Sequence, residues 1–189
     1  PDPSYHGMVW TEFAKAVGPI AYIVRARFVG LRDIGAALSP QSAFNIIQGL
    51  ETVSLRMEKH CSNAAKVAEY LSSHNKVSRV IYAGLDEGEA GDRANKYLKG
   101  GHGALCGIEL KGGKASGEKF INNLNMFYHV ANIGDARSLA IHPASTTHSQ
   151  LSDEDMEAAG VNPSYVRLSI GIEHIDDIIE DLKNALDAA

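Results

Sequence analysis

Cysteine is scarce in this sequence: its 189 residues include only two, Cys61 and Cys106. They show none of the close Cys or Cys/His spacings that bind zinc, so we predict no metal site and two reduced, buried, apolar side chains. The sequence also lacks an apolar run of about 18 residues, the length that a membrane helix needs. A basic excess is absent too, because 18 Lys and Arg face 23 Asp and Glu. These absences predict a cytoplasmic protein that binds neither membrane nor nucleic acid.

The sequence also lacks a phosphate-binding glycine loop and an initial Met. The glycine-rich Gly100-Gly101-His102-Gly103 precedes a predicted strand and offers no helix N-terminus, so it is not a phosphate-binding loop. The chain also begins without Met. Its opening Pro1-Asp2-Pro3-Ser4 is typical of extended backbone inside a loop. We therefore expect the chain to be part of a longer polypeptide.

The sequence before residue 75 has the apolar spacing of helices. The first stretch places apolar residues three and four positions apart, at Trp10, Phe13, Ala14 and Val17. A second helix is predicted over 20–31, ending near Gly30 or Gly35. Ser39-Pro40 then reads as an N-cap followed by proline in the first turn. The apolar stripe after it continues to about His74, with Gly49 as the expected break or bend.

After residue 76 the sequence changes to short segments rich in β-branched and aromatic residues. Strands are predicted at 77–82, 104–110, 128–131, 139–142 and 165–170. Further helices are predicted with Ser116 as a cap and with Ser152 in a capping box. A last helix is predicted from near Glu173, and its acidic first turn of Glu173, Asp176 and Asp177 complements the helix dipole. Strands separated by loops as well as helices favour an α+β fold, with a small, mostly antiparallel sheet and helices packed on it.

We predict a domain boundary inside the long helix. Residues 1–55 have helical patterns but no predicted sheet, so we expect them to belong to a domain whose remainder is absent. Residues 56–189 contain all of the predicted strands. They are therefore predicted to form a small C-terminal domain with its own core.

Arg167 is the most informative single residue. Alternation along the strand at 165–170 places it on the opposite face from Val166 and Leu168. An arginine beside small residues can present its planar fork to a carboxylate or a phosphate. From spacing alone, however, a solvent-facing arginine in a surface ion pair is the more ordinary interpretation.

The run from His142 to His148, HPASTTH, is dense in hydroxyls and imidazoles. Its ordinary interpretation is a loop that hydrogen-bonds its own backbone. A metal site from the two histidines lacks a third ligand, and a Ser145 nucleophile lacks an elbow motif and an orienting acid. Upstream, Asn132-Ile133-Gly134-Asp135 follows a strand and reads as a turn whose amides could bind an anion.

Six segments together carry a family resemblance: SYHG, VRARFVGLRDIGAALSPQSAF, GLETVSLRMEKH, IELKGG, NIGDARSLAIHPASTTHSQLS and VRLSIGIEHIDDIIEDL. In order and spacing they resemble the cystathionine-synthase and methionine-lyase group of pyridoxal-phosphate enzymes. Two features favour its O-acetylhomoserine sulfhydrylase branch: STTH, where lyases tend to have SMTH, and Asn132, where lyases and cystathionine synthases usually have serine.

The resemblance implies an aspartate-aminotransferase-like fold of type I and specific residue roles. Residues 1–55 would be the end of the large cofactor domain and the start of the linking helix, and 56–189 the small domain. Arg167 would bind the α-carboxylate of the substrate, assisted by Asn132 and the amide of Ile133. Supporting positions near the site would be Ser145, Thr146, Thr147, Arg32 and Asp33.

The implied reaction is a γ-replacement in methionine biosynthesis. O-acetyl-L-homoserine and sulfide would give L-homocysteine and acetate, with pyridoxal phosphate as the electron sink, in a homotetrameric enzyme. The Schiff-base lysine of such enzymes lies in an S-x-T-K context. None of the ten lysines of this chain has that context. We therefore predict that the chain contains no catalytic residue, does not hold the cofactor covalently and is inactive alone.

Two other hypotheses remain. A methionine γ-lyase or cystathionine γ-synthase of the same group would share these motifs, and sulfide incorporation without use of cysteine would separate them. A non-catalytic module that binds amino-acid carboxylates or docks to a partner belongs to a different class. The start at Pro1 and the helices before residue 50, which have no sheet of their own, argue against such a module.

Overall fold

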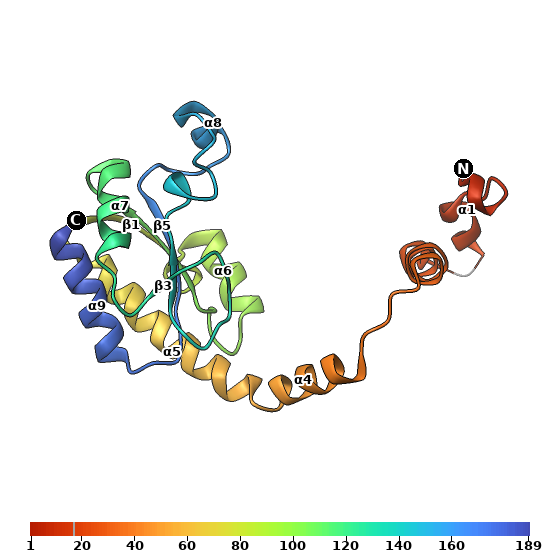
Figure 1. Ribbon diagram of the computed structural model, residues 1–189, viewed down its shortest axis with the longest axis horizontal. Helices are drawn as coiled ribbons and strands as arrows, with labels where there is room; N and C mark the ends of the chain where they lie inside the picture. The colour runs from red at the N-terminus through yellow and green to blue at the C-terminus, as the bar shows by residue number, and fades with distance from the viewer. Residues whose placement is uncertain (17) are drawn as a thin grey trace. The chain divides into compact units, whose positions relative to one another are not determined.

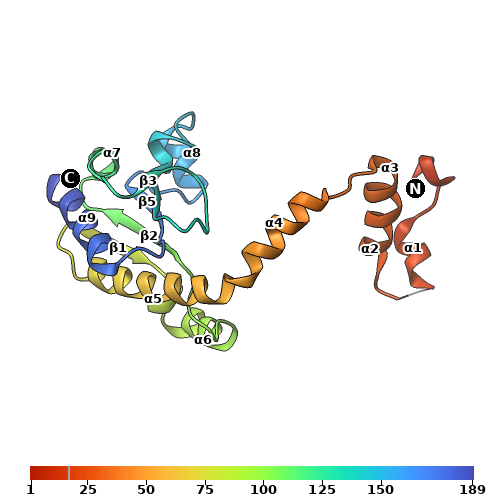
Figure 2. The same cartoon turned by 60° about the horizontal axis from the view of Figure 1, so that its bottom comes forward.

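A computed structural model of the protein describes residues 1–16 and 18–189, with only the backbone of Asp153. Val17, which belongs to the first predicted helix, lies outside the described residues. The chain divides into two compact units, Pro1–Leu50 and Glu51–Ala189. Figures 1 and 2 show the two units. No helix in the described part of the chain is both long and apolar enough to cross a membrane.

The first unit is a series of short helices: η1 (Pro3–Tyr5), α1 (Trp10–Lys15), α2 (Ala21–Arg25), the π-helical η2 (Ala26–Leu31), α3 (Arg32–Ile34) and α4 (Pro40–Glu51). The helix predicted over 20–31 continues to Gly35, whose φ of 69° is left-handed and suits glycine. Pro40 opens α4, and the Ser39 hydroxyl accepts the Ser42 N–H at 3.1 Å. The predicted start of this helix is confirmed.

This first unit buries little of its apolar surface. Apart from one bridge between Asp2 and Met8, its described residues form no strand. Helix α4 has no buried residue. Four of its apolar side chains are each more than half exposed: Phe44, Ile46, Ile47 and Leu50. The unit therefore lacks a packed core of the kind found in the second unit. Its assignment to a cofactor domain stays a prediction.

The long helix predicted from Pro40 is interrupted. Helix α4 ends at Glu51, and α5 spans Val53–Ser72. Thr52 separates them with φ −112° and ψ 8°, outside the helical range. Gly49, the expected break, remains inside α4. The predicted position of the break was therefore wrong by three residues.

The second unit is built on a five-stranded sheet with the order β1-β2-β5-β4-β3. Its strands are β1 (Val77–Ile81), β2 (Leu105–Leu110), β3 (Tyr128–His129), β4 (Leu139–Ile141) and β5 (Tyr165–Ser169). The pairs β1–β2, β2–β5 and β5–β4 are antiparallel, and β3–β4 is parallel. The predicted α+β class and mostly antiparallel sheet are confirmed.

Helices cover one face of this sheet. The remaining elements are η3 (Ala83–Leu85), α6 (Gly88–Tyr97), α7 (Gly113–Asn122), η4 (Pro143–Ser145), α8 (Asp153–Ala158) and α9 (Ile175–Ala188). Figures 1 and 2 show α5 and α9 side by side against the sheet, and α7 contacts α9, β2 and β5. The core between sheet and helices includes the fully buried Val67, Leu71, Ile108, Phe120, Leu168 and Leu182. The opposite face of the sheet is not covered by these helices and carries the side chains of Arg79, Glu109, Tyr165 and Arg167.

Several helix starts differ from those predicted. Helix α6 was not predicted, because its sequence is polar and only Gly91 and Ala94 are buried. Ser116 does not cap α7: the helix begins three residues earlier, and the Ser116 hydroxyl donates to the Lys111 carbonyl at 3.3 Å. The predicted cap of α8 is confirmed, since the Ser152 side chain accepts the N–H of Asp155.

The two cysteines differ in environment. Cys106 on β2 is fully buried, and this burial raises the pKa of its thiol to about 12. Cys61 on α5 is only partly buried. The predicted burial is therefore confirmed for Cys106 and wrong for Cys61.

Candidate functional site

Arg167 lies in the middle of β5, the central strand of the sheet. Its Cα pairs with Gly107 on β2 and with Ile141 on β4. Val166 and Leu168 on either side are fully buried in the core. Because side chains alternate along a strand, Arg167 lies on the face that the core does not occupy. The predicted alternation is confirmed.

The Arg167 side chain reaches the loop between β3 and β4. Its Nη2 donates to the backbone oxygen of Asn132 at 3.4 Å, a long hydrogen bond. Within residues 1–16 and 18–189 no carboxylate forms an ion pair with this arginine. The surface ion pair therefore does not occur in the described part of the chain. The positive charge faces a neutral carbonyl and stays available to an anion.

The turn at Asn132 is stabilised by its own side chain. The Ile133 N–H donates to Asn132 Oδ1 at 2.9 Å, and the Gly134 N–H lies 3.4 Å from the Ser169 hydroxyl. Both Asn132 and Ile133 are exposed. The predicted turn is confirmed. The Ile133 amide, however, already has an acceptor and would have to exchange it to meet a ligand.

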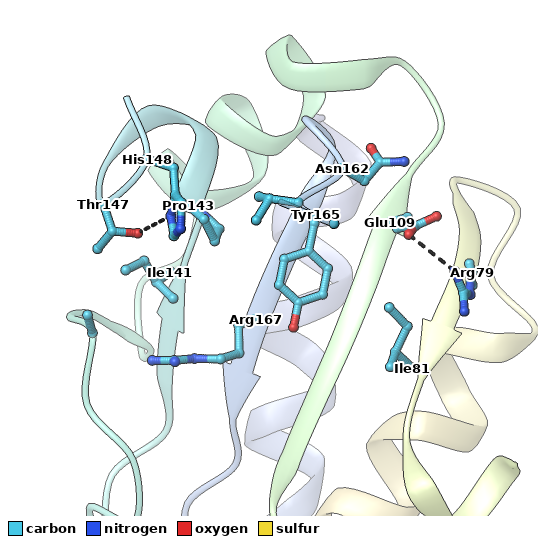
Figure 3. A pocket seen from close by; sticks show the side chains of 13 residues that line it. Arg79, Ile81, Glu109, Ile141, Pro143, Thr147, His148, Asn162, Tyr165 and Arg167 are labelled. Atoms are coloured by element: carbon cyan, nitrogen blue, oxygen red, sulfur yellow. Dashed lines mark hydrogen bonds and ion pairs between the residues drawn. The ribbon is translucent and has the colours of Figure 1, made fainter. Parts of the chain in front are cut away.

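A pocket of about 560 Å³ opens beside Arg167 on the uncovered face of the sheet. Figure 3 shows Arg167 and Tyr165 projecting into it from β5, with Arg79 and Glu109 on the far side. Its lining comes from four strands, from the loop between β3 and β4, and from the segments after β4 and before β5: Arg79, Ile81, Glu109, Ala131, Ile141, Pro143, Thr147, His148, Gly160, Val161, Asn162, Tyr165 and Arg167. The Arg79 Nη1 and Glu109 Oε1 atoms are 3.6 Å apart. The free positive charge of the pocket is thus at the Arg167 end.

Tyr165 forms the floor of the pocket next to Arg167. Burial raises the pKa of its phenol, and the Arg167 charge lowers it by less. The phenol is therefore neutral at physiological pH and can both donate and accept a hydrogen bond. Its ring lies over Gly107, where an added Cβ would be only 2.5 Å from the ring. The glycine on β2 makes room for the ring.

The HPASTTH loop is held mainly by bonds within itself. His142 is fully buried, with Nδ1 2.8 Å from the Ser145 hydroxyl and Nε2 2.8 Å from the Pro163 carbonyl. The Thr146 hydroxyl donates to the His142 carbonyl at 2.8 Å. Burial lowers the pKa of His142, so a neutral ring donates from Nε2 and accepts at Nδ1. The predicted self-bonded loop is confirmed.

Only one of the three predicted hydroxyl residues of this loop lines the Arg167 pocket. Thr147 does so, and its hydroxyl lies 2.9 Å from Nδ1 of His148. Ser145 and Thr146 do not line it and instead bond the buried His142. A Ser145 nucleophile would need His148 as its base, but the Ser145 hydroxyl is bonded to the buried His142 instead.

Arg32 and Asp33 lie in the first unit and contact the SYHG segment. The Tyr5 hydroxyl donates to Asp33 Oδ2 at 3.0 Å and also to the Phe28 carbonyl. Arg32 Nε is 3.7 Å from Asp33 Oδ1, and its guanidinium lies 5.7 Å from the centre of the Tyr5 ring. The SYHG segment and the segment around Arg32 and Asp33 are thus in direct contact within the first unit. Any role of these residues near Arg167 stays a prediction.

Sequence reasoning missed four polar residues of the pocket. Arg79, Glu109, Asn162 and Tyr165 all line it. Three of them lie in segments that were correctly predicted as strands, and alternation could have placed each on one face. What the sequence does not contain is the strand order, which brings β1 and β2 next to β5.

Neither a metal nor pyridoxal phosphate finds a complete site in the described residues. No three His, Cys, Asp or Glu side chains in residues 1–16 and 18–189 gather closely enough to hold a metal ion. No lysine lines the Arg167 pocket, and Lys76 is bonded to the carbonyls of Leu186, Asp187 and Ala189. The lining of this pocket thus includes a guanidinium without an ion pair among the described residues, and no lysine amine for a Schiff base.

Known proteins match almost the whole chain. A family model described as Cys/Met metabolism PLP-dependent enzyme matches residues 6–187. The O-acetyl-L-homoserine sulfhydrylase of Leptospira meyeri is 52% identical over 192 residues, which cover 98% of this chain and 43% of that protein. The L-methionine gamma-lyase of Fusobacterium nucleatum subsp. polymorphum is 46% identical over 162 residues, covering 85% of this chain and 41% of the lyase.

A solved structure matches as well. It is named as a candidate O-acetylhomoserine (thiol)-lyase of Campylobacter jejuni and carries N′-pyridoxyl-lysine-5′-monophosphate. Its TM-score is 0.81 at 43% identity, over 99% of this chain and 44% of that chain. Our chain thus spans less than half the length of these relatives. The resemblance drawn from the motifs is confirmed, and the chain belongs to the pyridoxal-phosphate-dependent enzymes of cysteine and methionine metabolism.

Proposed function

We propose that this chain supplies the substrate-carboxylate anchor of a pyridoxal-phosphate-dependent transferase. The enzyme would convert O-acetyl-L-homoserine and sulfide into L-homocysteine and acetate, a step of methionine biosynthesis. One observation carries the proposal: Arg167 projects into a pocket where, among the described residues, it meets only the neutral carbonyl of Asn132. The 52% identity with an O-acetyl-L-homoserine sulfhydrylase favours this particular reaction.

The chemistry of the pocket suits an α-carboxylate. A guanidinium binds both oxygens of a carboxylate through two parallel N–H bonds, which fixes its orientation as well as its position. Asn132 can add its side-chain amide, and the neutral Tyr165 hydroxyl is a second uncharged donor. These groups hold an amino acid by the part that does not react. They leave the γ-carbon free for the exchange of acetate for sulfide.

The other predicted positions have supporting roles in this proposal. Thr147 borders the pocket, whereas Ser145 and Thr146 hold the loop in place through His142. Arg32 and Asp33 stabilise the Tyr5 segment, and we keep them as supporting residues only.

The chain by itself is proposed to be inactive. None of the ten lysines has the S-x-T-K context and none lines this pocket, so we propose that the cofactor amine lies outside this chain. For the whole enzyme we propose a cytoplasmic homotetramer. The low cysteine content supports the compartment, and the family resemblance supports the assembly. Light scattering of the whole enzyme would measure its subunit number.

The experiment is an arginine replacement in the whole enzyme. Arg167→Ala should lower kcat/KM for O-acetyl-L-homoserine by roughly 30-fold to several thousand-fold, because losing a charged contact often costs about 2–5 kcal/mol. Arg167→Lys keeps the charge but not the fork and should recover part of the loss. Arg93→Ala is the control, since Arg93 lies on α6 and pairs with Glu89 at the surface. Unchanged kinetics in Arg167→Ala would remove the anchor role.

A second candidate is a lyase or cystathionine synthase of the same family, which the 46% identity with a methionine gamma-lyase supports. Purified whole enzyme should be offered sulfide, cysteine and methionine separately. Homocysteine from sulfide alone supports the sulfhydrylase, cystathionine from cysteine supports the synthase, and release of a thiol from methionine supports the lyase. Binding of amino acids without any turnover would instead favour a non-catalytic module.

A further inference from the structure

The loop that carries Asn132 is anchored at its other end by a carboxylate. Ser138, the last loop residue before β4, is fully buried. Its backbone N–H donates to Glu173 Oε1 at 2.6 Å, and its hydroxyl donates to Glu173 Oε2 at 2.9 Å. Hydrogen bonds to an ionised carboxylate are about twice as strong as neutral ones. One side chain thus satisfies both polar hydrogens of a buried serine.

Two backbone bonds reinforce this anchor. The Gly171 N–H donates to the Ser138 hydroxyl oxygen at 2.9 Å, and the Ile172 N–H donates to the Ala136 carbonyl at 2.9 Å. At Gly171 the backbone lies so close to Glu173 and to the loop that a residue with a side chain would not fit. A Cβ there would lie 2.2 Å from Glu173 Oε2 and 2.6 Å from the Ala136 oxygen. The glycine lets the carboxylate reach the loop.

Helix α5 holds the same segment from the other side. His60 Nδ1 lies 2.6 Å from the Ile170 carbonyl oxygen. Asn63 Nδ2 donates to the carbonyls of Gly171 and Glu173, at 3.0 and 2.9 Å. Both side chains are buried, and among the described residues their remaining polar atoms have no partner. The backbone that carries Glu173 is therefore fixed to α5 by these hydrogen bonds.

The first half of the loop has much weaker support. Asn132 is exposed, and its contacts in the described chain are the Ile133 amide and the 3.4 Å bond from Arg167. The next hydrogen bond along the loop runs from the Gly134 N–H to the Ser169 hydroxyl, at 3.4 Å. The shorter bonds that join the loop to the segment after β5 lie at Ala136 and Ser138. Asn132 is thus held between β3, which ends three residues earlier, and the Ser138 end of the loop.

We propose that Glu173 is a positioning residue for the carboxylate site. Through Ser138 it fixes the loop that holds Asn132 against Arg167, so that the guanidinium and the asparagine amide meet the same substrate carboxylate. The residue itself lines no part of the pocket. This inference rests on the proposed function, because it concerns the same ligand group.

The test uses the cofactor-loaded whole enzyme. Glu173→Ala should raise KM for O-acetyl-L-homoserine about tenfold, because the loop loses two charge-assisted bonds. The KM for sulfide, which has no carboxylate, and kcat should change less than about twofold. Glu173→Gln keeps one acceptor oxygen and should recover part of the affinity; it also serves if the alanine variant does not fold. Glu180→Ala, an exposed glutamate of α9, should behave as wild type.

Hydrogen exchange provides a readout that is independent of turnover. The Ser138 amide should be protected in the wild-type enzyme and exchange faster in Glu173→Ala, while amides of β5 keep their protection. A protected Ser138 amide in the variant, or equal rises in both KM values, would overturn the positioning role. Arg167→Ala is measured in parallel. If it has no effect, the proposed function fails; if it is impaired while Glu173→Ala is normal, only the positioning role fails.

Discussion

The ring of Tyr165 on β5 occupies the space that a side chain at Gly107 on β2 would need. A Cβ at Gly107 would lie 2.5 Å from Cε2 and 2.8 Å from the hydroxyl oxygen of Tyr165, well inside contact distance. Because both residues belong to paired central strands, the backbone has little freedom to move apart. Any larger residue at Gly107 must therefore move the tyrosine ring.

Gly107→Ala is expected to destabilise the fold by about 1–3 kcal/mol, the usual cost of overpacking. It should also weaken binding of the substrate, because the displaced ring leaves its place beside Arg167. Urea unfolding and KM for O-acetyl-L-homoserine measure the two effects. Gly49→Ala is the matched control: no atom outside its own helix lies within 4 Å of the added Cβ, and alanine favours helix. Equal stability of the two variants would contradict the packing argument.

Local patterns in the sequence were enough to find most of the second unit. The strand at 165–170 was recognisable because apolar residues alternate with small and polar ones, and Val166, Leu168 and Ile170 are indeed fully buried. Helix α6 was missed because its polar sequence packs only a glycine and an alanine. The break at Thr52 was misplaced because threonine gives no strong breaking signal.

The site was harder to predict because it depends on pairs that are distant in sequence. Arg167 was identified through a family resemblance, since its spacing alone favoured a surface ion pair. Glu173 was assigned to the first turn of a helix, whereas it precedes α9 and binds Ser138, 35 positions earlier. Asp176 and Asp177 occupy that first turn instead. No periodicity within one segment can reveal a contact of this kind.

His142 should make the stability of the protein depend on pH. Burial lowers the pKa of its imidazole, with the Pro163 carbonyl opposing this, while an unfolded histidine titrates near 6.5. Between these two pKa values the unfolded chain binds more protons than the folded one. The free energy of unfolding is thus unaffected by this group above about pH 6.5 and falls as the pH drops below it, by at most about 1.4 kcal/mol per pH unit.

The variant His142→Gln tests this expectation, because a glutamine side chain does not titrate. Its stability at pH 7.5 should be lower, since a packed ring and its bonds are lost. The loss on going from about pH 7 to pH 5 should be smaller than in the wild type. Urea unfolding at several pH values measures both. His6→Gln removes an exposed histidine of the first unit and should keep the wild-type pH dependence. An unchanged slope in His142→Gln would show that His142 is not the titrating group.

Asp181 on α9 holds the turn before β3. Its carboxylate is 7% exposed and accepts the backbone N–H groups of Asn125, Met126 and Phe127 at 2.9, 3.0 and 3.3 Å. Those donors face protein rather than water, so removing the acceptor leaves them without a partner. Asp181→Ala should lower the free energy of unfolding by about 3 kcal/mol, and Asp181→Asn, which keeps one acceptor oxygen, by about half as much.

Urea unfolding of Asp181→Ala should therefore show a lower midpoint with an unchanged slope, because the extent of surface exposed on unfolding stays the same. Hydrogen exchange should show faster exchange at the amides of residues 125–127. Asp187→Ala removes an exposed aspartate from the same helix and should change stability by less than about 0.5 kcal/mol. If Asp181→Ala is as stable as Asp187→Ala, the three bonds do not hold the turn. The entry into β3 must then be fixed by the packing of Phe127, which is itself buried in the core.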